Sequence, residues 1–325
     1  MQMTHYGALG FVAVLVASVT GAVIVSPPQA ATLAPRAHLD RQEAPTKVLP
    51  PKEVLPDGLS VLAAISAPAT TQKLSKTFQS LGYDLNMVAD GRGGVPRVLL
   101  TSFPGDLAKV RETKLRKAVF FKTVLPLVLT VNEEIKAERR RLWRLRYQRD
   151  TGQTIDAIDR LWLITMGEKY DVDGEDIDAL LVRADIIPPS LALAQAAEES
   201  GWGTSRFTRE GNAIFGEWTY SKRAGLVPQR RDKGKKHRIR IFGSLLESVR
   251  AYAGNLNTHR AYRELRRERA EMRRRGDAID GHVLAGQLTR YSERGAAYVK
   301  SLRGLMRHNK LRRLDGARLR DNREI

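Results

Sequence analysis

The stretch that decides the fold runs from Pro189 to Trp218 and reads PSLALAQAAEESGWGTSRFTREGNAIFGEW. It opens on proline, which is favoured in the first turn of a helix because its missing N–H would have no partner there. The glycines after Ser200 predict where the helix ends. On a helical wheel only Gln195, Glu198 and Glu199 form a polar arc, while leucine and alanine cover the rest. The sequence therefore predicts a helix that is buried nearly all round, with its polar groups facing a cleft or an internal partner.

Two adjacent carboxylates, Glu198 and Glu199, stand in the last turn of this helix. An anion is disfavoured there because the exposed carbonyl groups carry partial negative charge. That dipole, with partial desolvation beside Trp202, is expected to raise the pKa of a carboxyl group. Glycosidic bond cleavage needs an acid that is still protonated near neutral pH. A solvated glutamate pair at a frayed helix end explains the spacing equally well, and the wheel leaves open which glutamate would be the acid.

The chain is strongly basic, with a formal net charge of +19 over 325 residues. Such a chain is expected to bind polyanions, which include nucleic acid, anionic membrane surfaces and acidic cell-wall polymers. Residues 8–25 are uncharged and mostly apolar, which predicts a signal peptide or signal anchor over 1–31. Export disfavours nucleic acid as a partner. The absence of cysteine suits a bacterial envelope protein that needs no disulfide.

Composition predicts how the rest of the chain is organised. The expected segments are a Pro/Ala-rich flexible linker over 32–75, a mainly helical region over 76–170, a domain over 171–310 that holds the glutamate pair, and a basic tail over 311–325. Pro126 predicts a kink or break in the helical region, and a basic stretch around Asp232 predicts a hairpin. The sequence has neither a glycine-rich phosphate loop nor a Cys/His metal set, so it predicts no cofactor and no metal. The expected fold class is α+β, predominantly helical.

The stretch from Pro189 to Trp218 resembles the signature of bacterial glucosaminidase domains, peptidoglycan hydrolases of the lysozyme-like superfamily (glycoside hydrolase family 73). In that family A-Q-A-x-x-E-S-x-W-G-x-S is followed by G-N-x-x-F-G. The segments FGSLLESVRAYAGNLNTHRAYRELR and YSERGAAYVKSLRGLMRHN are similar to the Bax-like branch of proteobacteria, and the resemblance extends over residues 95–309. It implies a lysozyme-like fold with a small β-hairpin lobe, in a periplasmic envelope protein that is either released or tethered to the inner membrane by its leader.

The resemblance also implies roles for single residues. Glu199 would be the general acid in hydrolysis of the β-1,4 bond after N-acetylglucosamine in peptidoglycan. A tyrosine is expected near the catalytic centre, and the spacing leaves Tyr291 and Tyr298 as alternatives. A second carboxylate is expected in the β-lobe, where Asp232 is preferred slightly over Glu217. The 2-acetamido group of the substrate is an alternative to that carboxylate.

Aromatic and amide side chains around the signature are candidates for a sugar-binding cleft. Pyranose rings stack on aromatic surfaces, and an amide can hydrogen-bond an acetamido group. The candidates are Gln195, Trp202, Asn212, Phe215, Trp218 and Tyr220. Core packing explains Trp202 and Phe215 equally well.

Two further alternatives stay open. The arginine-rich helix expected over 261–275 is either a surface for acidic partners, such as peptidoglycan or an anionic membrane, or a solvated face. For the whole chain, the alternative to an enzyme is a non-catalytic peptidoglycan-binding or scaffold protein. A scaffold needs the aromatic platforms, and only the enzyme needs an acid at Glu199.

Overall fold

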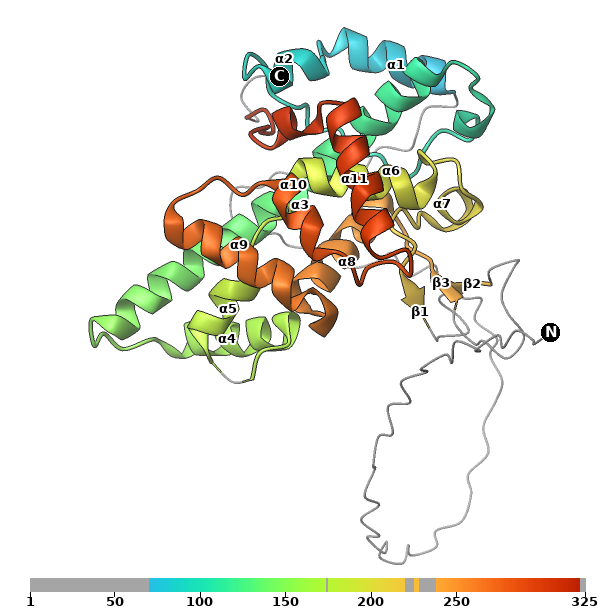
Figure 1. Ribbon diagram of the computed structural model, residues 1–325. Coiled ribbons are helices and arrows are strands. Elements are labelled where there is room, and N and C mark those ends of the chain that lie inside the picture. Colours follow the sequence, from blue (N-terminus) through green and yellow to red (C-terminus); the bar gives the residue numbers. More distant parts are fainter. Residues whose placement is uncertain (1–69, 174, 220–224, 228–237, 322–325) are drawn as a thin grey trace, which may run out of the picture. The chain divides into compact units, whose positions relative to one another are not determined.

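The computed structural model describes residues 70–173, 175–219, 225–227 and 238–321, so the predicted leader and most of the predicted linker lie outside the described residues (Figure 1). The described residues belong to one compact unit. The α-helices are α1 (Thr71–Ser80), α2 (Leu85–Ala89), α3 (Thr113–Asp150), α4 (Ala157–Tyr170), α5 (Ile177–Arg183), α6 (Pro189–Ser200), α7 (Arg206–Gly211), α8 (Leu245–Thr258), α9 (Arg263–Arg275), α10 (Gly281–Leu284) and α11 (Ala296–His308). Short 3-10 turns are η1 (Leu107–Lys109), η2 (Arg260–Tyr262), η3 (Ala285–Gln287) and η4 (Leu311–Leu314). Among these described helices, none has both the length and the apolar character to cross a bilayer.

Helix α6 is the buried centre of the fold, as its composition predicts. Every residue from Leu191 to Ala197 is at most 2% exposed. The helix packs against α3, α10 and α11 (Figure 1), and its alanines let these neighbours approach closely. Side chains from α1, α3, α8 and α11 complete the same hydrophobic core. A second, smaller core joins the end of α3 to α4 and α5 through residues such as Leu145, Leu163 and Leu180.

Helix α3 continues through Pro126 without a break. Proline has no N–H for the carbonyl one turn back, which ordinarily weakens a helix interior. Here Pro126 is buried, and its neighbours Leu125 and Leu127 are fully buried in the main core. Thr130 also donates its hydroxyl to the Pro126 carbonyl oxygen over 2.8 Å. Burial of the apolar side chains therefore outweighs the lost backbone hydrogen bond.

A left-handed turn ends α6 at the predicted position. Gly201, Trp202 and Gly203 have φ angles of 56°, 63° and 77°, a region that glycine tolerates and tryptophan rarely adopts. The turn is held by Ser200, whose Oγ accepts from the Gly203 N–H over 2.8 Å. A Cβ atom on Gly203 would lie 3.0 Å from Cδ2 of Leu107. The backbone conformation therefore favours glycine at positions 201 and 203, and close packing also requires it at position 203.

The strands form one small antiparallel sheet in the order β1-β3-β2, made of β1 (Trp218–Thr219), β3 (Arg238–Arg240) and β2 (Gly225–Leu226). Trp218 and Leu226 both pair with Ile239 on the central strand. The fold is therefore α+β and predominantly helical, with the small β-lobe that the sequence predicts. Asp232 in the predicted hairpin and Tyr220 after β1 lie outside the described residues.

The linker predicted over 32–75 and the tail predicted over 311–325 both differ from the structure. Helix α1 begins at Thr71, inside the stretch predicted as linker. Residues 311–321 pack on the core instead of forming a free basic tail, because Leu311 and Leu314 are buried. The N–H of Val95 also donates to the Arg318 carbonyl oxygen over 2.9 Å. The prediction of a basic tail is wrong for these residues, because the leucines spaced among the arginines are buried.

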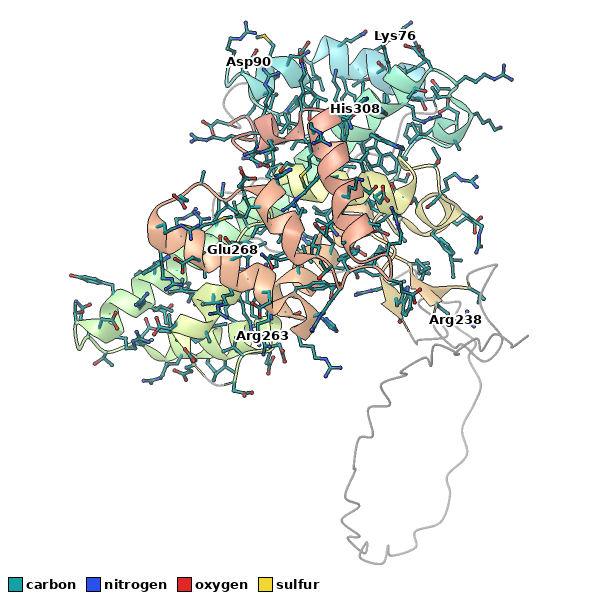
Figure 2. All side chains as sticks on the ribbon, in the orientation of Figure 1. Lys76, Asp90, Arg238, Arg263, Glu268 and His308 are labelled. Atoms are coloured by element: carbon teal, nitrogen blue, oxygen red, sulfur yellow. The ribbon has the colours of Figure 1, made fainter. Side chains whose placement is uncertain are left out.

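The arginine-rich helix α9 is partly a structural element. Arg263 and Glu268 lie along it (Figure 2), but Arg266 and Arg269 are only 4% and 0% exposed. The guanidinium of Arg269 donates to the backbone carbonyl oxygens of residues 182, 183, 185 and 186. It also donates to Oδ1 of Asn257 over 2.8 Å. Neither a solvated face nor a polyanion surface describes this buried side of the helix.

Candidate active site

Glu199 stands at the end of a hydrogen-bond relay that crosses three helices. Tyr298 on α11 donates its hydroxyl to Oε1 of Glu199 over 2.7 Å. Gln195 donates from Nε2 to the Tyr298 hydroxyl over 3.0 Å, and Tyr252 on α8 donates to Oε1 of Gln195 over 2.7 Å. The side chains of Gln195, Tyr252 and Tyr298 are at most 1% exposed. The relay therefore holds the Glu199 carboxyl in one orientation from the buried side.

Opposing influences set the pKa of Glu199. Burial raises it most, the hydrogen bond from Tyr298 lowers it, the charge of Glu198 raises it and the charge of Arg294 lowers it. The net result is a pKa above the ordinary value for glutamate. The direction agrees with the sequence-based expectation. Burial is the leading cause of the shift.

Glu198 has a different environment, although it is the adjacent residue. Its Oε1 forms an ion pair with Nη1 of Arg294 at 2.6 Å, and its Oε2 accepts from the Ser301 hydroxyl over 3.0 Å. Both carboxylate oxygens of Glu198 thus have a partner, one in the segment before α11 and one on α11 itself. The structure separates the two glutamates, which the helical wheel cannot do.

Three tyrosine rings line up beside Glu199. Tyr291 stacks on Tyr298 with ring centroids 5.5 Å apart and an interplanar angle of 2°. Tyr262 follows, 5.7 Å from Tyr291. The hydroxyl of Tyr291 donates to the Phe215 carbonyl oxygen over 3.4 Å, so only Tyr298 of the two candidates hydrogen-bonds the Glu199 carboxyl. Sequence spacing leaves this choice open, and the geometry separates the two residues.

Glu217 is the second buried carboxyl group near this centre. It precedes β1, and its side chain is 13% exposed. Its Oε1 is buried without a hydrogen-bond partner among the described residues, while Oε2 lies 3.9 Å from Nη1 of Arg240. Burial raises the pKa of Glu217 to about 7, and Arg240 opposes the rise. The sequence argument ranks Glu217 below Asp232 because Asp232 lies in the predicted hairpin. A pattern of residues does not reveal the burial of Glu217.

Glu217 and Glu199 both act on Tyr262. The pKa of the Tyr262 hydroxyl is raised to about 12, mainly by burial. A hydrogen bond with Asn255 lowers this pKa, while the negative charges of Glu217 and Glu199 raise it. Both carboxyl groups therefore lie near this one ring. The helical body supplies Glu199 and the entrance to the β-lobe supplies Glu217.

The other sugar-cleft candidates have dissimilar surroundings. Phe215 is 2% exposed and stacks on Tyr252 at a centroid distance of 3.8 Å. Asn212 adopts a positive φ of 51° at the end of α7 and donates from Nδ2 to the Phe242 carbonyl oxygen over 3.2 Å. Trp218 on β1 is 61% exposed. Of these three side chains, Trp218 is the one that presents a broad surface to solvent.

Trp202 is anchored to the core beside the acid. Its ring meets Phe120 and Phe121 edge-on, with centroids 5.8 Å and 5.3 Å away. The ammonium group of Lys117 lies 4.6 Å from the centre of the Trp202 ring. Trp202 is partly buried, so one part of the ring packs and another part borders the surface.

Comparisons with known proteins identify the family to which the chain is similar. The family model described as mannosyl-glycoprotein endo-beta-N-acetylglucosaminidase matches residues 175–311. Protein bax of Escherichia coli (strain K12) is 35% identical over 210 residues, which cover 63% of this chain and 73% of that protein. No solved structure is a significant match. The matched range holds Glu199, Glu217 and Tyr298, and we conclude that the chain belongs to the glucosaminidase-domain family of glycoside hydrolases, in its Bax-like branch.

Proposed function

We propose that this protein hydrolyses the β-1,4 bond after N-acetylglucosamine in bacterial peptidoglycan, with Glu199 as the general acid. The observation that carries the proposal is the Glu199 carboxyl, which has a raised pKa and accepts a hydrogen bond from Tyr298. Family membership supports a glycoside hydrolase that works in the cell envelope. The net positive charge supports attraction to the acidic polymer.

The proposed reaction begins with protonated Glu199. Its proton passes to the bridging oxygen as the bond to the anomeric carbon of N-acetylglucosamine breaks. The resulting Glu199 carboxylate is stabilised by the Tyr298 hydroxyl, because a hydrogen bond to a charged acceptor is stronger than one to a neutral acceptor. Gln195 and Tyr252 keep Tyr298 in place.

Glu217 is our candidate for the second carboxylate. In the deprotonated form it would accept a proton from the water that attacks the anomeric carbon. A pKa of about 7 suits this role near neutral pH. Asp232 remains a prediction from the sequence, as does participation of the substrate's own acetamido group.

The test is digestion of purified peptidoglycan by the full chain, because the core joins residues 70–170 to the matched domain. Glu199→Gln is expected to lower the rate by at least about 100-fold, the usual contribution of a general acid. Glu198→Gln is the matched control and should retain most activity, since its partners are Arg294 and Ser301. Mass spectrometry of new reducing ends identifies the bond. Binding without cleavage by wild type would favour the scaffold function, and ends in N-acetylmuramic acid would overturn the proposed bond choice.

A further inference from the structure

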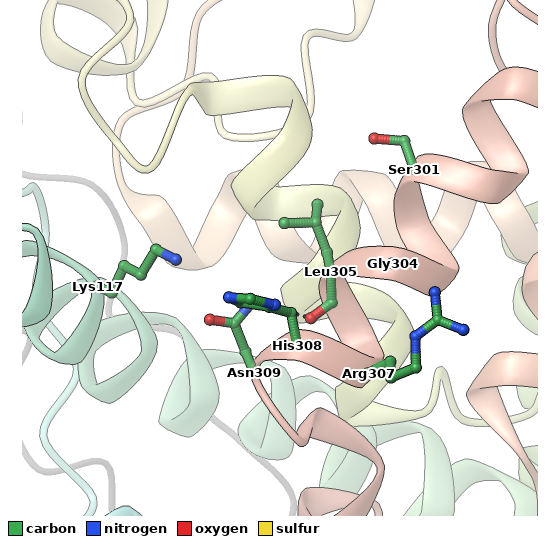
Figure 3. A pocket seen from close by; sticks show the side chains of 7 residues that line it. All are labelled: Lys117, Ser301, Gly304, Leu305, Arg307, His308 and Asn309. Carbon is green, nitrogen blue, oxygen red and sulfur yellow. Dashed lines mark hydrogen bonds between the residues drawn. The ribbon is translucent and has the colours of Figure 1, made fainter.

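A basic pocket lies between α3 and the end of α11. Its volume is about 720 Å³, which is within the range of small-ligand sites. It is lined by Lys117, Ser301, Gly304, Leu305, Arg307, His308 and Asn309. Figure 3 shows Lys117 reaching from α3 toward His308 and Asn309 across the opening, and His308 also marks this end of α11 in Figure 2.

The charges of the pocket favour an anionic ligand. Lys117 and Arg307 supply two cations, and none of the described residues that line the pocket is acidic. Glu198, which accepts a hydrogen bond from the lining residue Ser301, forms an ion pair with Arg294. Ser301, His308 and Asn309 add polar groups that can hydrogen-bond carboxylate oxygens.

Two contacts connect this pocket to the candidate active site. Ser301 lines the pocket and donates to Glu198, the residue next to Glu199. Lys117 lines it from the other side and lies over Trp202, three positions after Glu199. A polymer whose bond reaches Glu199 would therefore bring its next substituent close to the pocket.

We propose that this pocket binds a free carboxylate of the peptidoglycan stem peptide, which branches from the sugar that follows the cleaved bond. This inference rests on the proposed function, since it assigns the substrate of the same site. It makes the protein selective for glycan strands that still carry their peptides. The sugar backbone alone would leave Lys117 and Arg307 without an anionic partner in the pocket.

The experiment measures kcat/KM of the full chain on two soluble glycans, one with its stem peptides and one stripped of them by an amidase. Wild type should favour the peptide-bearing glycan by about tenfold, equivalent to about 1.4 kcal/mol. The double variant Lys117→Gln with Arg307→Gln should reduce this ratio to about one. Arg274→Gln, an exposed arginine on α9, is the matched charge control and should keep the wild-type ratio.

The outcomes separate this inference from the proposed function. Failure of wild type to cleave either glycan would overturn the proposed function. An active double variant with the wild-type ratio would overturn only the stem-peptide pocket. An unchanged ratio with weaker binding to phosphatidylglycerol vesicles would instead assign the pocket to a membrane surface. If the double variant does not fold, the wild-type ratio is measured in low and high salt, and a ratio that does not fall with salt contradicts the proposal.

Discussion

At Glu199 burial and the Tyr298 hydroxyl act on the pKa of one carboxyl group in opposite directions. Burial favours the protonated form, which the proposed reaction needs at its start. The Tyr298 hydroxyl favours the charged form, which appears after proton transfer. The same residue is therefore prepared for both of its protonation states by groups on different sides.

Removing the Tyr298 hydroxyl should shift the pH dependence of the reaction. In Tyr298→Phe the pKa of Glu199 rises because a hydrogen bond that lowers it is lost. The acid then stays protonated to higher pH, so the alkaline limb of the kcat profile moves upward, while kcat itself falls for lack of stabilisation of the carboxylate. The measurement is the rate from pH 5 to pH 9. Tyr291→Phe should leave the limb in place, and an unshifted limb in Tyr298→Phe would contradict the relay.

Sequence reasoning identified part of this centre. The polar arc of Gln195, Glu198 and Glu199 follows from helical periodicity alone. Tyr252 could not be predicted as a member of this centre because it lies 57 positions from Gln195. A periodic pattern carries no information on contacts between helices. The burial of Glu217 could not be predicted for a related reason, since it depends on how the β-lobe packs against the helical body.

At the scale of elements, α9 illustrates how a charged run can serve the core. The end of α5 presents carbonyl groups that have no partner within their own helix. Arg269 supplies donors to several of them at once, and Arg273 pairs with Asp185 at 2.9 Å. Helix α9 thus connects α5 to α8 through buried polar contacts of Arg269. Composition predicted a charged helix, but only packing decides which arginines point inward.

Replacing Arg269 by methionine should therefore be strongly destabilising. Arg269→Met fills much of the volume but leaves several buried carbonyl oxygens without donors, each at a cost of about 1–3 kcal/mol. We expect the free energy of unfolding to fall by at least about 3 kcal/mol in urea titrations. Arg274→Met is the control, because the Arg274 side chain is 73% exposed, and it should change stability by less than about 0.5 kcal/mol. Similar losses in both variants would argue against the buried role.

For the whole molecule, two partly buried acids predict how stability depends on pH. The pKa of Glu217 is raised from 4.5 to about 7 and that of Asp315 from 3.8 to about 6, mainly by burial. The folded protein therefore holds more protons than the unfolded chain between about pH 4 and 7. Stability contributed by these two groups must fall as the pH rises through that window.

The variant Glu217→Gln removes the contribution of Glu217 to the pH dependence of the unfolding free energy. Wild type should lose up to about 3 kcal/mol of unfolding free energy from the Glu217 group between pH 5 and pH 8, at about 1.4 kcal/mol per unit of pKa shift. Glu217→Gln cannot titrate there, so its stability should fall less over the same interval. Urea titrations of both proteins at the two pH values give the comparison. Parallel losses would show that Glu217 is not a buried acid.

The fold class and the central helix could be predicted from the sequence because hydrophobic periodicity and the Gly-Trp-Gly turn are local signals. The end of the chain could not. Leu311 and Leu314 are buried only because α6 and α11 provide a surface for them. The sequence around these two leucines is short and rich in arginine, so the sequence alone predicts a basic tail.

The first turn of α6 takes its partner from this late segment. Asp315 accepts hydrogen bonds from the N–H and the hydroxyl of Ser190, 125 positions earlier, over 2.7 Å and 2.8 Å. The ribosome therefore makes Glu199 long before it makes Asp315. A chain that stops before residue 315 would carry Glu199 on a helix whose first turn lacks these two hydrogen bonds.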